Sequence, residues 1–186
     1  MMGGQQAEWT LSEAARLLEE PQHRLIYLCE KGVVQPDLQD AEGRGSSRRF
    51  SARNLLEFGV ALRLRELGIP ASVIGAVLHV LRGFESAIGK KLSGFELPGR
   101  LTVTGAPELK VIIGDDQRLY FSLESGKGKA KTYGGVSIHD LMVSGDDSDQ
   151  HKKPIRGVGN EAKPGQLLAK VEVSVTGIAN ELGLGV

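Results

Sequence analysis

The residues with the clearest chemical potential form a short basic segment in the first third of the chain. Between positions 44 and 53 the sequence has no acidic residue and four arginines: Arg44, Arg48, Arg49 and Arg53. The whole chain has 23 basic and 23 acidic residues, so this excess of positive charge is local. A local arginine cluster suits a small phosphate footprint better than broad non-specific binding. A solvated charged loop would have the same composition if this segment is taken alone.

A second group of polar side chains lies on a predicted helix that precedes the basic segment. Pro21 can open this helix, and Gly32 can supply a left-handed cap at its end. Leu25, Leu28 and Cys29 form the predicted inner stripe. The positions that face outward or flank this stripe are Gln22, His23, Arg24, Ile26, Tyr27 and Glu30. Such side chains can reach base edges and phosphates.

Patterns that would indicate an enzyme or a metal site are missing. The adjacent carboxylates at 115–116 and 146–147 fall in predicted turns, where aspartate is expected for turn chemistry alone. The four histidines have no ligand spacing, and the lysines of 125–135 lack the preceding glycine and the GK[ST] ending of a phosphate-binding loop. We therefore predict that the protein is not an enzyme and uses no cofactor or metal. Cys29 has two interpretations, a buried structural thiol or an oxidant-sensitive one.

Capping signals and hydrophobic periodicity predict the elements that position these residues. Thr10 and Glu13 form a capping box that starts a helix near Leu11, and the helix that begins at Pro21 follows it directly. The glycines at 43–45 mark the tip of a hairpin whose return strand is 46–50. A strand at this position would direct Arg48 or Arg49 at a phosphate backbone, with Phe50 in the core.

Two further helices complete this part of the chain. Ser51 is the predicted cap of a third helix that ends at Gly68, and Pro70 restarts the chain as a fourth helix over about 71–84. Two short helices, a basic hairpin and a longer helix occur in this order in a winged helix-turn-helix. In that arrangement the second helix enters the major groove and the hairpin holds phosphates.

The same residues resemble the mercury-resistance regulator (MerR) family of winged-helix transcription factors over about residues 9–85. The resemblance rests on Thr-Leu-Ser-Glu-Ala-Ala at 10–15, Leu25, Tyr27, Lys31-Gly32, Pro36, Arg48-Arg49-Phe50-Ser51, Leu55 and Arg65-Glu66-Leu67-Gly68-Ile69. It implies a bacterial regulator that binds double-stranded DNA and contacts RNA polymerase, with an effector that the sequence does not identify. The operator contacts that it implies by position are Tyr27 and Arg48.

The second helix departs from the family pattern at two positions. Ile26 stands where the family has a DNA-binding arginine, and Cys29 stands where it has an acid. One interpretation is a different operator, in which an apolar contact with a thymine methyl replaces an arginine. The other is a helix that no longer reads DNA.

Assembly is the second departure, because the family dimerises through a long coiled coil after the fourth helix. Here Gly83, Gly89 and Pro98 interrupt the pattern, and no heptads are sustained. We still expect a two-fold homodimer, since symmetric half-sites require one. Its interface would use the C-terminal segment or apolar residues of the fourth helix that could equally form the chain's own core: Val73, Val77, Val80, Leu81 and Phe84.

The second half of the chain has the period-two pattern of strands. We expect strands from about Leu101, on both sides of a turn at 114–117, and at 167–175, followed by one or two helical turns. The loops at 125–135 and 144–165 are rich in Gly, Ser, Asp and Lys and are predicted to be mobile. The predicted fold class is α+β: a tail at 1–9, the winged helix-turn-helix at 10–86, a linker at 87–100 and a small β-rich domain at 101–186.

Composition sets the remaining expectations. No apolar run approaches the length needed to span a bilayer, and the first ten residues lack the features of a secretory signal, so we expect a cytoplasmic protein without a membrane partner. The single cysteine fits a reducing compartment. The leading hypothesis is a MerR-like DNA-binding regulator. The alternatives are a winged-helix protein-interaction adaptor and an excisionase-like architectural DNA-binding protein.

Overall fold

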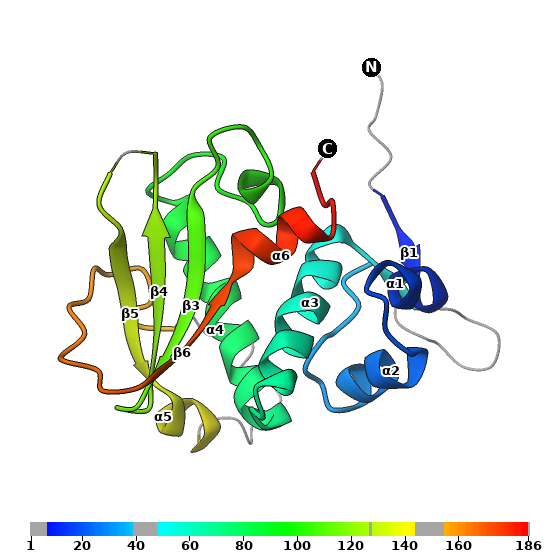
Figure 1. Ribbon diagram of the computed structural model, residues 1–186, viewed down its shortest axis with the longest axis horizontal. Coiled ribbons are helices and arrows are strands. Elements are labelled where there is room, and N and C mark those ends of the chain that lie inside the picture. The colour runs from blue at the N-terminus through cyan, green and yellow to red at the C-terminus, as the bar shows by residue number, and fades with distance from the viewer. Residues whose placement is uncertain (1–6, 39–47, 127, 144–154, 186) are drawn as a thin grey trace.

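The computed structural model describes residues 7–38, 48–126, 128–143 and 155–185. Helices dominate its N-terminal half and an antiparallel sheet forms most of its C-terminal half, which makes it an α+β fold as predicted (Figure 1). The N-terminal helices are α1 (Leu11–Leu17), α2 (Gln22–Glu30), α3 (Ala52–Glu66) and α4 (Ala71–Gly89).

Local signals in the sequence account for the ends of these helices. Thr10 and Glu13 form the predicted capping box, with Thr10 N donating to Glu13 Oε2 at 2.8 Å. Ser51 forms a second box with Asn54 at the start of α3. Gly32 and Gly68 follow α2 and α3 with φ values of 67° and 81°, the left-handed region in which glycine meets no steric penalty. The helix starts and stops predicted here are confirmed, except that α4 continues past position 84 to Gly89.

The return strand of the predicted hairpin pairs with the start of the chain. Strand β2 (Arg49–Phe50) is antiparallel to β1 (Trp9–Thr10), so Trp9 belongs to a sheet and not to the predicted tail. Phe50 is fully buried, as predicted, and meets Phe58 of α3 edge-on, with ring centroids 5.2 Å apart. The predicted hairpin tip at 43–45 and Arg44 lie outside the described residues, and the wing stays a prediction.

The C-terminal sheet has the strand order β5-β4-β3-β6 with every neighbour antiparallel. Its strands are β3 (Glu108–Gly114), β4 (Arg118–Glu124), β5 (Lys131–Ser137) and β6 (Lys170–Ser174). Two short helices, α5 (Ile138–Val143) and α6 (Val175–Glu181), follow β5 and β6. Val111 of β3 lies between Phe121 of β4 and Val173 of β6 in the register, so its neighbours extend the core across the sheet.

Two of the predicted C-terminal elements are wrong. Residues 131–135, expected in a mobile loop, belong to β5, because β4 and the backbone of 160–162 provide hydrogen-bond partners on both sides. The stretch from Leu101, expected as a strand, is a 3₁₀ turn (η1, Gly99–Leu101) followed by further turns. Pro98 and Gly105 favour such turns over an extended strand.

Helix α4 lies between α3 and the sheet and joins the two halves of the fold (Figure 1). Its apolar side chains are buried against both, and they include four of the residues considered for a dimer interface: Val77, Val80, Leu81 and Phe84. In the described part of the chain α4 alone has the length and composition of a membrane-spanning helix. Packing on two sides accounts for that composition, since a helix that is apolar around most of its surface is typical of a core.

Candidate nucleic-acid interface

The outer face of α2 carries the polar side chains expected from its periodicity. Gln22, His23 and Arg24 are exposed, whereas Leu25 and Leu28 are fully buried beneath them. Arg24 forms an ion pair with Glu20, in which Nη1 lies 2.9 Å from Oε2. The carboxylate of Glu20 neutralises much of the charge of Arg24. To contribute to DNA binding, this arginine would have to leave Glu20 or contact Glu20 and a phosphate at the same time.

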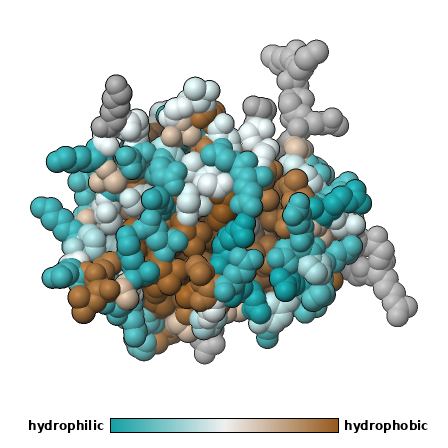
Figure 2. All heavy atoms as spheres, viewed as in Figure 1, coloured by the Kyte–Doolittle hydropathy of each residue, from teal (hydrophilic) through white to brown (hydrophobic). Residues whose placement is uncertain are grey.

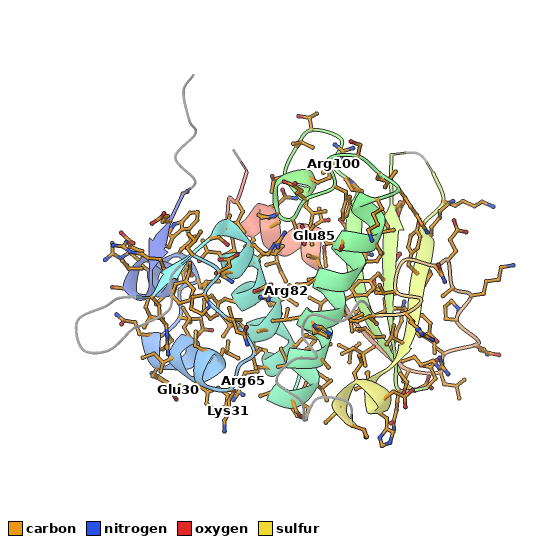
Figure 3. All side chains as sticks on the ribbon, turned by 180° about the vertical axis from the view of Figure 1, so that it is seen from behind. Glu30, Lys31, Arg65, Arg82, Glu85 and Arg100 are labelled. Atoms are coloured by element: carbon orange, nitrogen blue, oxygen red, sulfur yellow. The ribbon has the colours of Figure 1, made fainter. Side chains whose placement is uncertain are left out.

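The Tyr27 ring contacts two cations that the sequence analysis did not select as DNA contacts. The guanidinium of Arg65, near the end of α3, lies 4.7 Å from the centre of the Tyr27 ring, and Lys31 Nζ lies 5.8 Å from it. Both cations are exposed, and Figure 3 places them next to each other below α2. Cation–π contacts of this kind hold the ring in place and keep two positive charges beside α2. Lys31 could have been found from its i+4 spacing to Tyr27, but Arg65 is brought there only by tertiary packing.

The two positions that depart from the family pattern are half-buried. Ile26 and Cys29 are both of intermediate exposure, and the Cys29 side chain packs against the core. Ile26 therefore keeps part of its apolar surface available on the outer side of α2. The predicted inner position of Cys29 agrees with its packing.

The arginines of the basic segment separate in the structure. Arg48 and Cys29 both line a groove of about 410 Å³ at the end of α2, so the start of β2 lies close to this helix. Arg49 pairs in register with Thr10, and its charge makes a small contribution to lowering the pKa of Glu13, which the hydrogen bonds from Thr10 lower most. Arg53 is directed elsewhere, since its Nη2 lies 2.7 Å from Glu85 Oε1 on α4.

A buried polar network fixes the segment that follows α2. The Asn54 side chain is fully buried, receives a hydrogen bond from Asp37 N at 3.0 Å and donates to the Gln35 carbonyl at 2.9 Å. It also donates to Glu57, which Arg82 of α4 holds with two hydrogen bonds of 2.6 Å. The network ties the chain on its way to the predicted wing to α3 and α4.

The arrangement offers cations, an aromatic ring and amide and imidazole groups, which are the groups that contact phosphates and bases. Among the described residues no three His, Cys, Asp or Glu side chains are grouped so that they could hold a metal ion. The structure thus places Gln22, His23, Arg24, Ile26 and Tyr27 on one helix, with Arg48 near the end of that helix and Arg49 in β2.

Comparison with known proteins finds similarity in the part of the chain that contains this candidate interface. No curated protein matches the sequence. A family model matches residues 9–81, which run from β1 to the middle of α4 and exclude the C-terminal four-stranded sheet. This confirms the resemblance expected for that segment: residues 9–81 match the MerR HTH family regulatory protein model.

Proposed function

We propose that the protein is a DNA-binding transcription regulator that presents α2 to the major groove and Arg48 to the phosphate backbone. The observation that carries the proposal is the outer face of α2, where exposed Gln22, His23 and Arg24 continue into Tyr27 and its two cations. The match to a regulatory HTH family over residues 9–81 supports it.

Arg65 and Lys31 extend the interface beyond the residues predicted from the sequence. Each is exposed, and each lies against Tyr27, whose side chain fixes where the positive charges stand relative to α2. Phosphate contacts set the register of a protein on a duplex, while base contacts specify the sequence. We therefore assign Arg65, Lys31 and Arg48 to phosphates and Gln22, His23 and Ile26 to base edges, with the Ile26 side chain against a thymine methyl.

Fluorescence anisotropy with labelled duplexes at two salt concentrations tests this assignment. The duplexes are the region upstream of the protein's own gene and a random sequence of equal length. Arg65→Ala and Arg48→Ala should each weaken binding to both duplexes and make the salt dependence shallower by about one phosphate contact. Arg100→Ala is the matched control, because Arg100 is exposed on η1, away from α2 (Figure 3).

The outcomes separate the proposal from its alternatives. Absence of salt-dependent binding at low salt would contradict DNA binding and favour the protein-interaction adaptor. Equal affinity for both duplexes together with bending of the DNA would favour the excisionase-like architectural protein. If Arg100→Ala weakened DNA binding as much as Arg65→Ala and Arg48→Ala do, the positive charge of the protein would act without a defined interface.

The proposal includes two partners, a second copy of the same chain in a homodimer and RNA polymerase. Since four of the five apolar α4 residues considered for a dimer are buried within the chain, we assign the dimer interface to the C-terminal segment, where Met142, Val143 and Leu168 are exposed. Figure 2 shows hydrophobic surface at the lower left of the molecule, on the side where Figure 1 places the sheet. The molar mass from light scattering should be that of a dimer for the parent and that of a monomer for Val143→Lys. A monomeric parent would contradict the assignment.

A further inference from the structure

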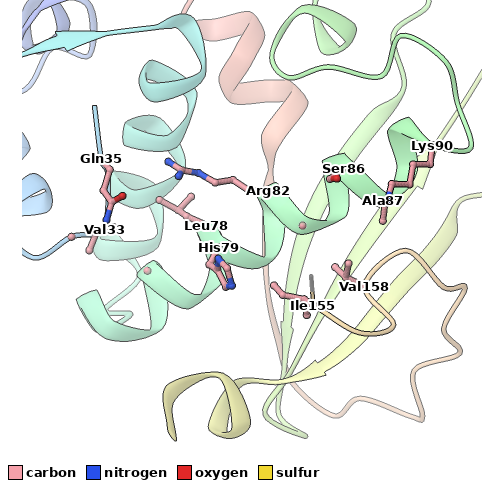
Figure 4. A pocket seen from close by; sticks show the side chains of 13 residues that line it. Val33, Gln35, Leu78, His79, Arg82, Ser86, Ala87, Lys90, Ile155 and Val158 are labelled. Carbon is pink, nitrogen blue, oxygen red and sulfur yellow. The ribbon is translucent and has the colours of Figure 1, made fainter. Parts of the chain in front are cut away.

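A cavity of about 340 Å³ lies along α4, next to the segment that follows α2. Its walls come from three parts of the chain: the segment after α2 at Gly32, Val33 and Gln35, one side of α4 from Gly75 to Lys90, and Ile155 with Val158 from the segment before β6 (Figure 4). The volume lies within the range of sites that hold small organic ligands.

Among the described residues that line this cavity two are cationic, five are apolar and none is acidic, and Glu57 outside the lining pairs with Arg82. Arg82, Ser86 and Lys90 follow each other at i, i+4 and i+8 along α4, so they stand in one row with Ser86 in the middle. Figure 4 shows this row along the helix, with Ile155 and Val158 beside it. The side chains of Val33, Leu78 and Ala87 add further apolar surface.

Both cations of the row keep donors for a ligand. Glu57 takes Nε and Nη2 of Arg82, and within the described residues Nη1 of Arg82 makes no hydrogen bond. Lys90 is exposed and forms no ion pair in the same part of the chain. Lys91, its neighbour, instead donates to the Gly159 carbonyl at 2.5 Å and holds the segment that carries Val158 against α4.

Two glycines keep the cavity open on the side of α4. A Cβ atom added at Gly75 would meet no atom of the described residues within 4 Å, so none of their side chains occupies the space beside this residue. At Gly83 the nearest atom would be Ile155 Cδ1 at 3.3 Å, which shows that the opposite wall approaches the helix there. Larger residues at either position would fill the space that the cavity occupies.

We propose that this cavity binds a small organic anion with an apolar body. The acid group of the ligand lies over Ser86, between Arg82 and Lys90, and its hydrocarbon part lies against Leu78, Ile155 and Val158. An anion is favoured because Arg82 and Lys90 line the cavity and no carboxylate of the described residues does. An apolar body is favoured because contact with the flanking walls removes hydrocarbon surface from water. The site does not depend on DNA binding by α2, although a ligand in it would touch Gly32 and Val33 directly after that helix.

The probe for this site is 8-anilinonaphthalene-1-sulfonate, whose fluorescence rises when it binds in apolar surroundings. N-phenyl-1-naphthylamine has the same aromatic body without the sulfonate and serves as the neutral comparison. We expect one sulfonate bound per folded chain in the absence of DNA. Lys90→Gln should weaken sulfonate binding about threefold and leave the neutral probe unchanged. Lys129→Gln is the matched control, because Lys129 is exposed in the segment before β5.

The Gly75→Leu variant tests the cavity without changing its charge. Its side chain enters space that no described residue occupies, and leucine favours a helix, so the variant should fold and melt at or above the parent's temperature. It should weaken both probes about tenfold by occupying the cavity. Parent-like binding by Gly75→Leu, or equal effects of Lys90→Gln and Lys129→Gln, would overturn the proposal. Because no duplex is present, these outcomes do not depend on whether the protein binds DNA.

Discussion

Two glutamates, Glu57 of α3 and Glu85 of α4, carry their carboxyl groups in buried surroundings. Glu57 is 2% exposed and lies in a two-point contact with Arg82, while Glu85 is 7% exposed and accepts hydrogen bonds from Leu97 N and Arg53. Burial outweighs these partners at Glu85 and raises the pKa of its carboxyl above the usual value. In the described residues no buried side-chain polar atom lacks a hydrogen bond, so the charges are satisfied.

The raised pKa of Glu85 predicts a stability that falls as the pH rises. Above the ordinary carboxyl pKa of 4.5 the unfolded chain releases this proton before the folded chain does, so the folded state loses free energy relative to the unfolded state until the pH passes the raised value. Glu85→Gln keeps an acceptor for Leu97 N and removes the titration. Urea unfolding at pH 4.5 and pH 7 should therefore show the variant gaining on the parent at the higher pH. A constant difference between the two proteins would contradict this.

At the scale of elements, local signals and tertiary partners decide different parts of the fold. Capping residues such as Thr10 and Ser51 act within one helical turn, so they predict where α1 and α3 begin. Strand β5 could not be predicted, because its lysine and glycines read as a loop and its pairing partners lie on β4 and at 160–162.

The candidate site divides in the same way. The exposure of Gln22, His23 and Arg24 follows from helical periodicity within α2, which can be read from the sequence. The cation–π contact of Arg65 with Tyr27 joins residues 38 positions apart and requires the packing of α3 against α2. Residues that act within one element were therefore predictable, and residues that act between elements were not.

Two helical glycines should respond to alanine in opposite directions. A Cβ at Gly59 of α3 would lie 2.6 Å from Ile178 Cγ2 of α6, whereas a Cβ at Gly75 of α4 would have no atom within 4 Å in the described part of the chain. Alanine favours a helix over glycine by about 0.8–1 kcal/mol. Overpacking at Gly59 should exceed this gain, because such strain amounts to about 1–3 kcal/mol. Urea unfolding should show Gly75→Ala stabilised and Gly59→Ala destabilised.

A double variant supplies the control for the glycine pair. Ile178→Ala removes the side chain that a methyl at Gly59 would meet, so Gly59→Ala should cost less stability in that background than in the parent. An equal loss in both backgrounds would show that the close approach of α3 and α6 is not what requires glycine at this position.

At the scale of the whole molecule, one hydrophobic cluster spans the helices and the sheet. Phe84 of α4 stacks on Phe121 of β4 with ring centroids 4.6 Å apart and contacts Phe95 and Tyr133 as well. The family match ends at residue 81, so this aromatic group begins where the similarity stops. The segment 87–100, predicted as a linker, contributes buried Phe95 and Leu97 to the same cluster. The helical part therefore depends on a sheet that its family match does not include.

This shared core predicts that the helices and the sheet unfold together. Trp9, the single tryptophan, packs on the helical part, so its fluorescence reports on that part alone, while far-UV circular dichroism reports on both. Phe84→Ala should destabilise the protein by about 3–5 kcal/mol, and Phe121→Leu, a change in the sheet, by less. Within each variant, the transition followed by Trp9 fluorescence and the transition followed by circular dichroism should shift together to one lower temperature, because a single cooperative unit gives coincident transitions. A Trp9 transition that stays at the parent's temperature in Phe121→Leu would instead identify two independently folding domains, divided where the sequence places the linker.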